Sequence, residues 1–361
     1  MGWNVRVFDP DGDALPDVEA TLIRARATLP ALYDVALPPD GRVIAVSTIG
    51  EAVAGVDWVQ DSTPEDPDRK ANVLQQVQAR CSRHAVIACS AAGPGIDAFR
   101  GGATRPEQIL RIRAFDPVYL IPRVQIDGAD PATLARADTI LRGIGVAPGP
   151  AEPAAALHAA TSDPAQPEAW RDATIVALLR ALKSRDAPLA APIRAHEAAL
   201  APPAPDPDLP APPVTLHRQV PVTWADYNGH MTEAQYLTAF SEAADRLLLW
   251  AGMDAAAIAA GVSVFTVETH IRHLAEVQIG DRIRVSTRVL QGGGRKLHLW
   301  HALCVGDTPC ATGEQLLLHV DLATRRSAPP PAAIADWLAR AAAAHAALPV
   351  PEGLGRNVGQ R

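Results

Sequence analysis

The sequence predicts two domains of different class, an α/β domain followed by an α+β domain. In the first 146 residues, short apolar runs alternate with helical stretches, which is typical of βαβ units on a parallel sheet. After residue 213, one long helix precedes several strands of alternating polarity, which indicates an antiparallel sheet. Residues 201–213 read APPAPDPDLPAPP, and proline this dense permits neither helix nor sheet ladder.

Apolar runs and amphipathic stretches locate the elements of the first domain. Helices are expected near residues 15–33 and 67–80. Residues 147–167 are rich in Ala and Pro without a helical stripe, whereas 173–182 predict an amphipathic helix, with a weaker one behind it. We therefore expect residues 147–213 to be a linker that carries a few helices. The predicted strands are residues 5–10, 42–46, 56–62, 85–90 and 109–117.

The second domain, residues 214–330, is expected to hold a central helix at about 232–251, and a last helix at 331–347 precedes a polar tail. Its strands are predicted at 214–223, 262–274, 282–291, 296–305 and 313–323. Spacing of three and four residues predicts that the central helix buries Leu237, Phe240, Ala244, Leu247, Leu248 and Ala251. Alternation along the strand at 262–274 predicts a core face of Phe265, Val267, Thr269 and Ile271.

Composition excludes several classes of function. The formal net charge of −7 gives no reason to expect nucleic acid or an anionic membrane surface as a partner. The four cysteines form no CxxC pair and are expected to be reduced thiols. No apolar run approaches the roughly 18–20 residues of a membrane span, and the N-terminus lacks a signal-peptide pattern. The histidines show no metal-binding spacing such as HExxH. We expect a cytoplasmic protein that needs no metal.

Residues 224–236 read WADYNGHMTEAQY and combine a turn, a cap and an acid. Asn228-Gly229 predicts a turn with positive φ, and Thr232 followed by Gln235 predicts a capping box at the start of the central helix. The first amides of a helix are free and carry partial positive charge, which suits an oxygen that becomes negative during acyl transfer. Asp226 precedes these amides, so it is either the acid of the turn or a catalytic carboxylate.

WADYNGHM, followed by a helix and then FTVETHIRHL, resembles the hotdog-fold acyl-CoA thioesterases of the 4-hydroxybenzoyl-CoA type. The resemblance implies that Asp226 activates water or attacks the thioester as a nucleophile. It implies an oxyanion site in the helix N-terminal amides, and His230 either orients the carboxylate or packs at the helix entry. The implied oxyanion and substrate-binding residues are Asn228, Gly229, Met231, Thr232 and Glu233. Glu268 and His270 are further catalytic candidates, since in such enzymes their strand lines the cleft between subunits.

The first half resembles a second family. GWNVRVFDPD, VDWVQDSTPEDPDRK, VIACSAAG and FDPVYLIPRV resemble successive blocks of the L-carnitine dehydrogenases, in the 3-hydroxyacyl-CoA dehydrogenase superfamily. The resemblance implies an incomplete Rossmann-like domain, because the family's first strand, its glycine-rich loop and most of its helical substrate domain have no counterpart. Asp9 follows a strand where dinucleotide folds hold a ribose hydroxyl, but it also fits an Asp-Pro-Asp-Gly turn.

Three positions depart from this family where its chemistry takes place. The family's catalytic serine matches Ala92, its base histidine matches Arg113, and the glutamate that orients the histidine matches Gln125. An arginine cannot accept a proton near neutral pH, and alanine cannot bond a substrate hydroxyl. We therefore expect an inactive dehydrogenase half and no functional use of NAD, while the thioesterase needs no cofactor.

In some bacteria the dehydrogenase is fused to a thioesterase, so the resemblance implies betainyl-CoA as substrate and a homodimer or homotetramer formed through the hotdog domain. A trimethylammonium group favours aromatic faces. The available aromatic residues are Trp224, Tyr227, Tyr236, Phe240 and Trp300. Two alternatives stay open. An upstream start restoring the glycine-rich loop would give an NAD-dependent carnitine dehydrogenase, and a decayed fusion would give a non-catalytic binding or assembly module.

Overall fold

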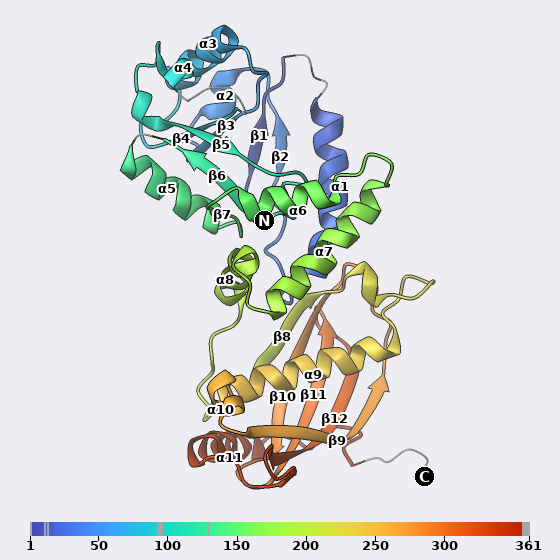
Figure 1. Cartoon of the computed structure of the whole chain (residues 1–361). Coiled ribbons are helices and arrows are strands. Elements are labelled where there is room, and N and C mark those ends of the chain that lie inside the picture. The colour runs from blue at the N-terminus through green and yellow to red at the C-terminus, as the bar shows by residue number, and fades with distance from the viewer. Residues whose placement is uncertain (1, 11, 13, 92–96, 129, 356–361) are drawn as a thin grey trace. The chain divides into compact units, whose positions relative to one another are not determined.

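The computed structural model describes residues 2–10, 12, 14–91, 97–128 and 130–355. The chain forms two compact units. The first comprises Met1–Tyr33 and Leu37–Leu200, and the second comprises Asp34–Ala36 and Ala201–Arg361. The first is a Rossmann-like α/β unit and the second is an α+β hotdog unit, which confirms the predicted fold classes (Figure 1).

The strands of the first unit form two separate sheets. In the described part of the chain, β1 and β2 form a parallel pair of their own, and the other sheet has the order β3-β4-β5-β6-β7. Within it, β3, β4 and β5 are parallel, whereas β6 runs antiparallel to β5. The sequence predicted the first five of these strands and missed the last two. Their bounds are β1 Val5–Val7, β2 Val43–Ala45, β3 Trp58–Asp61, β4 Val86–Ser90, β5 Ile109–Arg113, β6 Arg123–Asp127 and β7 Ala147–Pro148.

Helices surround these sheets, and three of them lie in the region predicted to be a linker. Helix α6 forms in the Ala/Pro-rich stretch, where no helix was predicted, because Ala154 and Leu157 pack against the apolar core of the unit. Helices α7 and α8 add Ile175 and Ile193 to the same core. The longer helices are α1 Ala14–Leu32, α3 Pro67–Gln78, α5 Pro131–Arg142, α6 Glu152–Thr161, α7 Glu168–Ser184 and α8 Ala191–Leu200, and the short ones are α2 Ile49–Val53 and α4 Asp97–Arg100.

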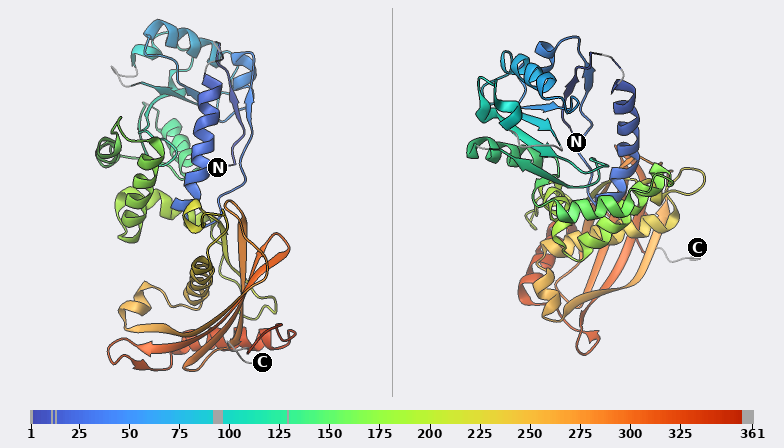
Figure 2. Two further views of the ribbon diagram at one scale, coloured as in Figure 1. Left: turned by 90° about the vertical axis from the view of Figure 1, so that its right-hand side faces the viewer. Right: turned by 45° about the horizontal axis from the view of Figure 1, so that its top comes forward.

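In the second unit a curled antiparallel sheet wraps around one central helix (Figures 1 and 2). The strand order is β8-β10-β11-β12, and β12 also pairs with β9 and with the short β13. The strands are β8 Val214–Gln219, β9 Val262–His273, β10 Arg282–Gln291, β11 Lys296–Val305, β12 Thr308–Asp321 and β13 Arg326–Ser327. The helices are α9 Glu233–Trp250, α10 Ala255–Ala259 and α11 Ala332–Ala346.

The buried face of α9 matches the prediction at most positions, but near its start it includes Tyr236 in place of the predicted Leu237. Phe240, Ala244, Leu247 and Leu248 are buried as expected, but Leu237 is 43% exposed. Tyr236, Ala239 and Ala243 are buried instead. The ring of Phe240 packs against β12 at Gly313, where an added Cβ would lie only 2.6 Å from the ring, so this close approach requires glycine.

Among the described residues, strand β9 bonds to β12 alone, so one of its two edges is paired. Phe265 and Val267 are 41% and 52% exposed, so the prediction that they belong to the core was wrong. Ile271, further along the same strand, does pack against the core as predicted. Apolar side chains in the middle of β9 are thus exposed beside an unpaired strand edge.

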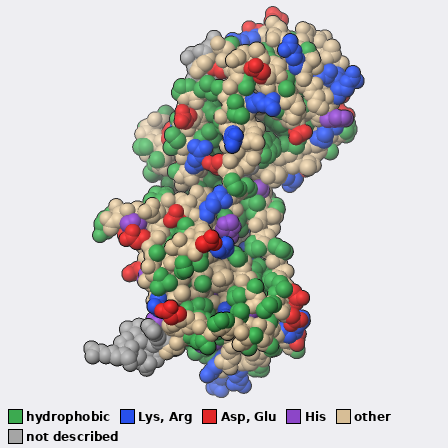
Figure 3. All heavy atoms as spheres, turned by 180° about the vertical axis from the view of Figure 1, so that it is seen from behind, with side chains coloured by type: hydrophobic (Ala, Val, Ile, Leu, Met, Phe, Trp, Pro, Cys, Tyr) green, Lys and Arg blue, Asp and Glu red, His purple; other side chains and the backbone are tan. Residues whose placement is uncertain are grey.

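No helix among the described residues is long and apolar enough to cross a membrane. On the face shown in Figure 3, acidic and basic side chains are interspersed with apolar ones.

Candidate functional site

The loop between Trp224 and α9 is a tight hairpin. Ala225 and Met231 form an antiparallel bridge, and the Asp226 amide donates to the His230 carbonyl at 2.9 Å. Gly229 has φ +79°, which confirms the predicted positive-φ turn at Asn-Gly. These backbone contacts hold Asp226 next to the residues that enter the helix.

Asp226 uses one carboxylate oxygen to build the loop and leaves the other open. Its Oδ1 accepts hydrogen bonds from the amides of Asn228, at 2.8 Å, and His230, at 3.2 Å. No described residue bonds to Oδ2, and the side chain is exposed. The two bonds to Oδ1 are those of a turn acid. The open Oδ2 is a second feature, because it can accept a proton or attack a carbonyl carbon.

The predicted oxyanion amides are only partly free. The Met231 amide donates to the Val277 carbonyl at 2.7 Å, and the Thr232 amide donates to the Trp224 carbonyl at 2.9 Å. Glu233 and Ala234 are the first two residues of α9, and their amides have no carbonyl within the helix to donate to. Among the described residues, the helix N-terminus therefore offers these two amides as donors. Of the predicted oxyanion residues only Glu233 remains, and Ala234 joins it.

Thr232 is the N-cap of α9, but its side chain makes no capping hydrogen bond. The predicted capping box is therefore wrong in its side-chain part, although the position of the helix start is right. The backbone of Thr232 instead ties the helix entry to Trp224. This tertiary bond takes the place of the local cap.

The His230 ring points to an acid that the sequence did not single out. Its Nε2 lies 3.4 Å from Oε2 of Glu276, in the segment after β9. Only the backbone amide of His230 contacts the Asp226 carboxylate. No local pattern could have paired His230 with Glu276, because 46 positions separate them and the contact depends on the bridge from His230 to Gln278.

Glu268 and His270 lie on β9, where the strand pairing sets them opposite Leu316 and Glu314. Among the described residues of a single chain, neither hydrogen-bonds to Asp226, so the structure does not bring these candidates together with the loop. The carboxylate of Glu314 lies 2.8 Å from Nε2 of His298.

A buried arginine packs against Trp224, the residue at which the loop begins. The side chain of Arg218, on β8, is 2% exposed and donates through one nitrogen to both carboxylate oxygens of Glu242 on α9, each at 2.9 Å. Its guanidinium carbon lies 4.3 Å from the centre of the Trp224 ring. No local sequence pattern predicts this group, since the three residues come from a strand, a loop and a helix.

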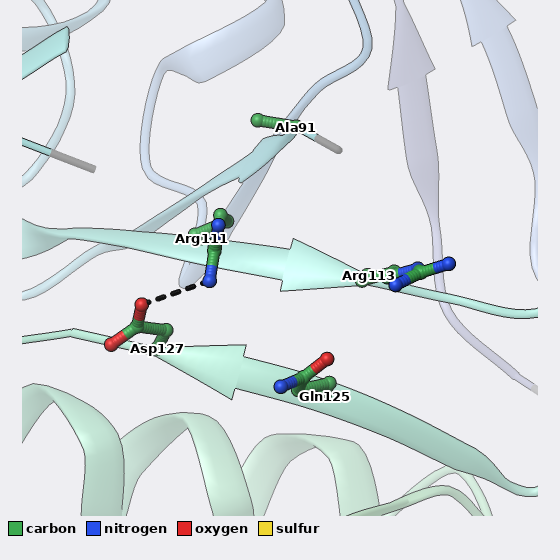
Figure 4. Close-up of a pocket in the computed structure, with 5 residues that line it drawn as sticks. All are labelled: Ala91, Arg111, Arg113, Gln125 and Asp127. Atoms are coloured by element: carbon green, nitrogen blue, oxygen red, sulfur yellow. Dashed lines mark hydrogen bonds and ion pairs between the residues drawn. The ribbon is translucent and has the colours of Figure 1, made fainter. Parts of the chain in front are cut away.

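In the first unit, two of the three substituted dehydrogenase positions face one another. Arg113 and Gln125 are register partners on β5 and β6. They line a small pocket together with Ala91, Arg111 and Asp127 (Figure 4). Ala92, the third position, lies outside the described residues.

The described residues do not fit a dinucleotide. A Rossmann fold holds the pyrophosphate on a glycine-rich turn between a strand and a helix. Asp9 follows β1, but β1 pairs only with β2, and β3 pairs only with β4. No described strand joins these two edges, and neither β1 nor β3 leads into a GxGxxG turn. The described part of the chain therefore lacks the cradle that the pyrophosphate requires.

Comparison with known proteins gives a family for each half. Residues 1–149 match the model of the NAD-binding domain of 3-hydroxyacyl-CoA dehydrogenases. Residues 220–338 match the model of the thioesterase-like superfamily. A crystal structure of a putative thioesterase from Pseudomonas putida is 32% identical, with a TM-score of 0.37, and the match covers 42% of this chain and 97% of that one.

Two relatives extend the comparison. The betainyl-CoA thioesterase of Pseudomonas aeruginosa is 44% identical over 139 residues, which cover 38% of this chain and 87% of the relative. The L-carnitine dehydrogenase/betainyl-CoA thioesterase of Ruegeria pomeroyi is 35% identical across 99% of this chain and 94% of the relative. That alignment spans 460 positions against 361 residues here, so the relative carries sequence with no counterpart in this chain. The chain belongs to the L-carnitine dehydrogenase/betainyl-CoA thioesterase family.

Proposed function

We propose that the chain is an acyl-CoA thioesterase that hydrolyses betainyl-CoA to betaine and free coenzyme A, with Asp226 as its catalytic carboxylate. The observation that carries the proposal is the open Oδ2 of Asp226, held by the loop beside the start of α9. The thioesterase-like family match over residues 220–338 supports it. The identity to a relative named as a betainyl-CoA thioesterase supports the choice of acyl group.

The chemistry follows from these groups. Asp226 Oδ2 removes a proton from water as the water oxygen adds to the thioester carbonyl carbon. The carbonyl oxygen becomes negative and is stabilised by the free amides of Glu233 and Ala234 at the positive end of the helix. The carbon–sulfur bond then breaks, and coenzyme A leaves as a thiolate that takes up a proton. In the second route compatible with this geometry, Oδ2 attacks the carbonyl carbon directly and water hydrolyses the resulting anhydride.

Tyr227 is the aromatic residue that we assign to the trimethylammonium group. Trp224, Tyr236, Phe240 and Trp300 are buried in the core, whereas Tyr227 is 96% exposed and adjoins Asp226 in the same loop. A cation near an aromatic face is stabilised by about 0.5–2 kcal/mol. Tyr227→Ala is expected to raise KM for betainyl-CoA without raising it for 3,3-dimethylbutyryl-CoA, the neutral isostere. An equal rise for both thioesters would exclude this role.

We also propose that two copies pair through the free edge of β9. Such an edge, with Phe265 and Val267 exposed beside it, is the kind of surface that a second strand covers. Glu268 and His270 lie on this same strand. A partner copy would therefore bring them toward the Asp226 loop of the first, which one chain alone does not.

Release of the coenzyme A thiol from a panel of thioesters that includes betainyl-CoA tests the central claim. Asp226→Asn keeps an oxygen that accepts the loop amides but removes the charge, so kcat should fall by about 100-fold or more. Asp254→Asn is the matched control, because Asp254 is also a loop carboxylate whose Oδ1 accepts from an amide, that of Ala257 at 2.9 Å. Hydrolysis of no thioester, or an unchanged kcat in Asp226→Asn, would leave a non-catalytic module as the better account.

The dehydrogenase half is proposed to be inactive. The guanidinium of Arg113 stands where the family has its base, and the neutral Gln125 faces it on the next strand. The name of the Ruegeria relative includes a dehydrogenase. The proposal differs from that name because of the residues that this chain has at the two positions. Formation of NADH on mixing the chain with L-carnitine and NAD would overturn it.

A further inference from the structure

The second unit includes three residues from the early part of the sequence. The segment Asp34–Ala36 lies between α1 and β2 in the chain, yet it belongs to the second unit. The Ala36 amide donates to the His217 carbonyl of β8 at 2.7 Å, and Val35 is buried. In the described part of the chain β8 pairs with β10 alone, so the segment bonds to a strand at the end of the sheet.

The Asp34 carboxylate reaches a buried guanidinium. Its Oδ1 lies 3.2 Å from Nη1 of Arg218, whose side chain is 2% exposed. Glu242 of α9 binds the same nitrogen with both of its carboxylate oxygens, each at 2.9 Å. Two acids from separate segments of the chain thus converge on one nitrogen. A guanidinium that is held by a single acid can pivot about that contact, so the second acid fixes its orientation.

The orientation of this guanidinium bears on the loop of the candidate site. Its carbon lies 4.3 Å from the centre of the Trp224 ring. The Trp224 carbonyl accepts the Thr232 amide at 2.9 Å, so the position of Trp224 sets where α9 begins relative to the loop. Asp226 lies between these two residues in the sequence. In an active site, a misplacement of about 1 Å can cost roughly a hundredfold in rate.

Stability alone is a weak account of this contact. The Asp34 side chain is 37% exposed, and ion pairs of exposed acids contribute little to stability. We propose that Asp34 is a positioning residue for thioester hydrolysis, acting through Arg218 and Trp224 on the loop that carries Asp226. This inference rests on the function proposed for Asp226. It gives the dehydrogenase-like half of the sequence a part in hydrolysis, because that half supplies Asp34 to the thioesterase unit.

Steady-state hydrolysis by the full chain tests the proposal, with the thioester of the panel that the natural chain hydrolyses fastest. Asp34→Asn keeps the size of the side chain and removes its charge, so kcat should fall by about threefold to tenfold. KM should change little, because Asp34 does not touch the substrate in this proposal. Asp34→Glu restores the charge and should recover most of the loss. Asp40→Asn is the matched control and should leave kcat unchanged, because Asp40 lies in the same connection between α1 and β2 and pairs with the exposed Arg26, at 2.6 Å.

A double-mutant cycle tests the route through Arg218. If Asp34 acts through this arginine, Asp34→Asn should lower kcat in the natural chain and have no further effect when Arg218→Met is already present. The same cycle is measured on the urea unfolding midpoint, which does not require hydrolysis and also establishes that each variant is folded. A contact that only stabilises the fold would change the midpoint without changing kcat.

Two results would overturn the role of Asp34: an unchanged kcat in Asp34→Asn, whatever its midpoint, or an equal fall in kcat with and without Arg218→Met. Either result, together with a large fall in kcat in Asp226→Asn, would leave the proposed function standing and remove this inference alone. Hydrolysis of no thioester by the natural chain is a different result, because it would remove the proposed function and this inference with it.

Discussion

The guanidinium carbon of Arg218 lies 4.3 Å from the centre of the Trp224 ring, and Trp224 begins the loop that carries Asp226. The Trp224 carbonyl also accepts the amide of Thr232, where the helix starts. Arg218 thus contacts the residue to which both ends of the loop are joined. Its own charge is balanced by Glu242, bonded at 2.9 Å, and by Asp34 at 3.2 Å.

Arg218→Met should lower the free energy of unfolding by roughly 1–3 kcal/mol, because Glu242 loses its two charge-assisted hydrogen bonds. Arg284→Met removes an exposed arginine from β10 and should change stability by no more than about 0.5 kcal/mol. Urea unfolding compares the two. If Arg218 also positions the loop, Arg218→Lys should reduce kcat for thioester hydrolysis, with KM less affected. Equal stability of the two methionine variants would contradict this role.

A buried ion pair stabilises the first unit. The side chains of Lys70 and Asp61 are 0% and 1% exposed, with 2.9 Å between Nζ and Oδ2, and Nζ also donates to the Thr63 carbonyl at 2.8 Å. Asp61→Ala should destabilise the unit by about 3–5 kcal/mol, because it leaves a buried ammonium without its counter-charge. Asp138→Ala breaks an exposed pair with Arg142 and should have an effect of less than about 1 kcal/mol. Comparable urea unfolding midpoints for both variants would refute the stabilising role of the Lys70–Asp61 ion pair.

Local signals in the sequence were enough to predict most elements and the turn at the candidate site. The Asn228-Gly229 turn and the helix after it depend on residues within a few positions, and both form as predicted. The exposure of Phe265 and Val267 was not predictable, since alternation does not reveal which strand lies at an edge. The same holds for α6, whose helix depends on packing rather than on its own pattern.

At the candidate site, the sequence identified the acid and missed its surroundings. Asp226 was found because acid, turn and helix start are neighbours in the chain. Glu276 and Arg218 reach the loop from distant strands and segments, and the chain gives no signal for such contacts. Two of the predicted oxyanion amides proved to be bonded to carbonyls that only the tertiary fold brings close.

His301 should make the second unit less stable in mild acid. Burial lowers the pKa of this imidazole to about 4, from an ordinary value near 6.5. As the pH falls from 7.5 to 5, the unfolded chain takes up a proton that the folded chain does not, so about 2 kcal/mol of stability should be lost, with little further loss from this residue below pH 4.

Urea unfolding at pH 7.5 and pH 5 measures the loss, and His301→Gln should reduce it. Part of the pH dependence should persist in that variant, because burial also lowers the pKa of His319 and of His345. A variant that loses as much stability as the natural chain would show that His301 is not responsible.

The free edge of β9 provides the last prediction. If two copies pair there, light scattering should give at least the mass of a dimer, and Val267→Lys should give a monomer, since a lysine on an edge strand opposes strand pairing. Leu209→Lys is the matched control, because Leu209 is 52% exposed in the segment before β8, the strand at the opposite end of the sheet from β9. Thioester hydrolysis should fall with dimerisation in Val267→Lys, because the proposed dimer is what would bring Glu268 and His270 to the Asp226 loop. A monomeric natural chain with full activity would contradict both the interface and the shared site.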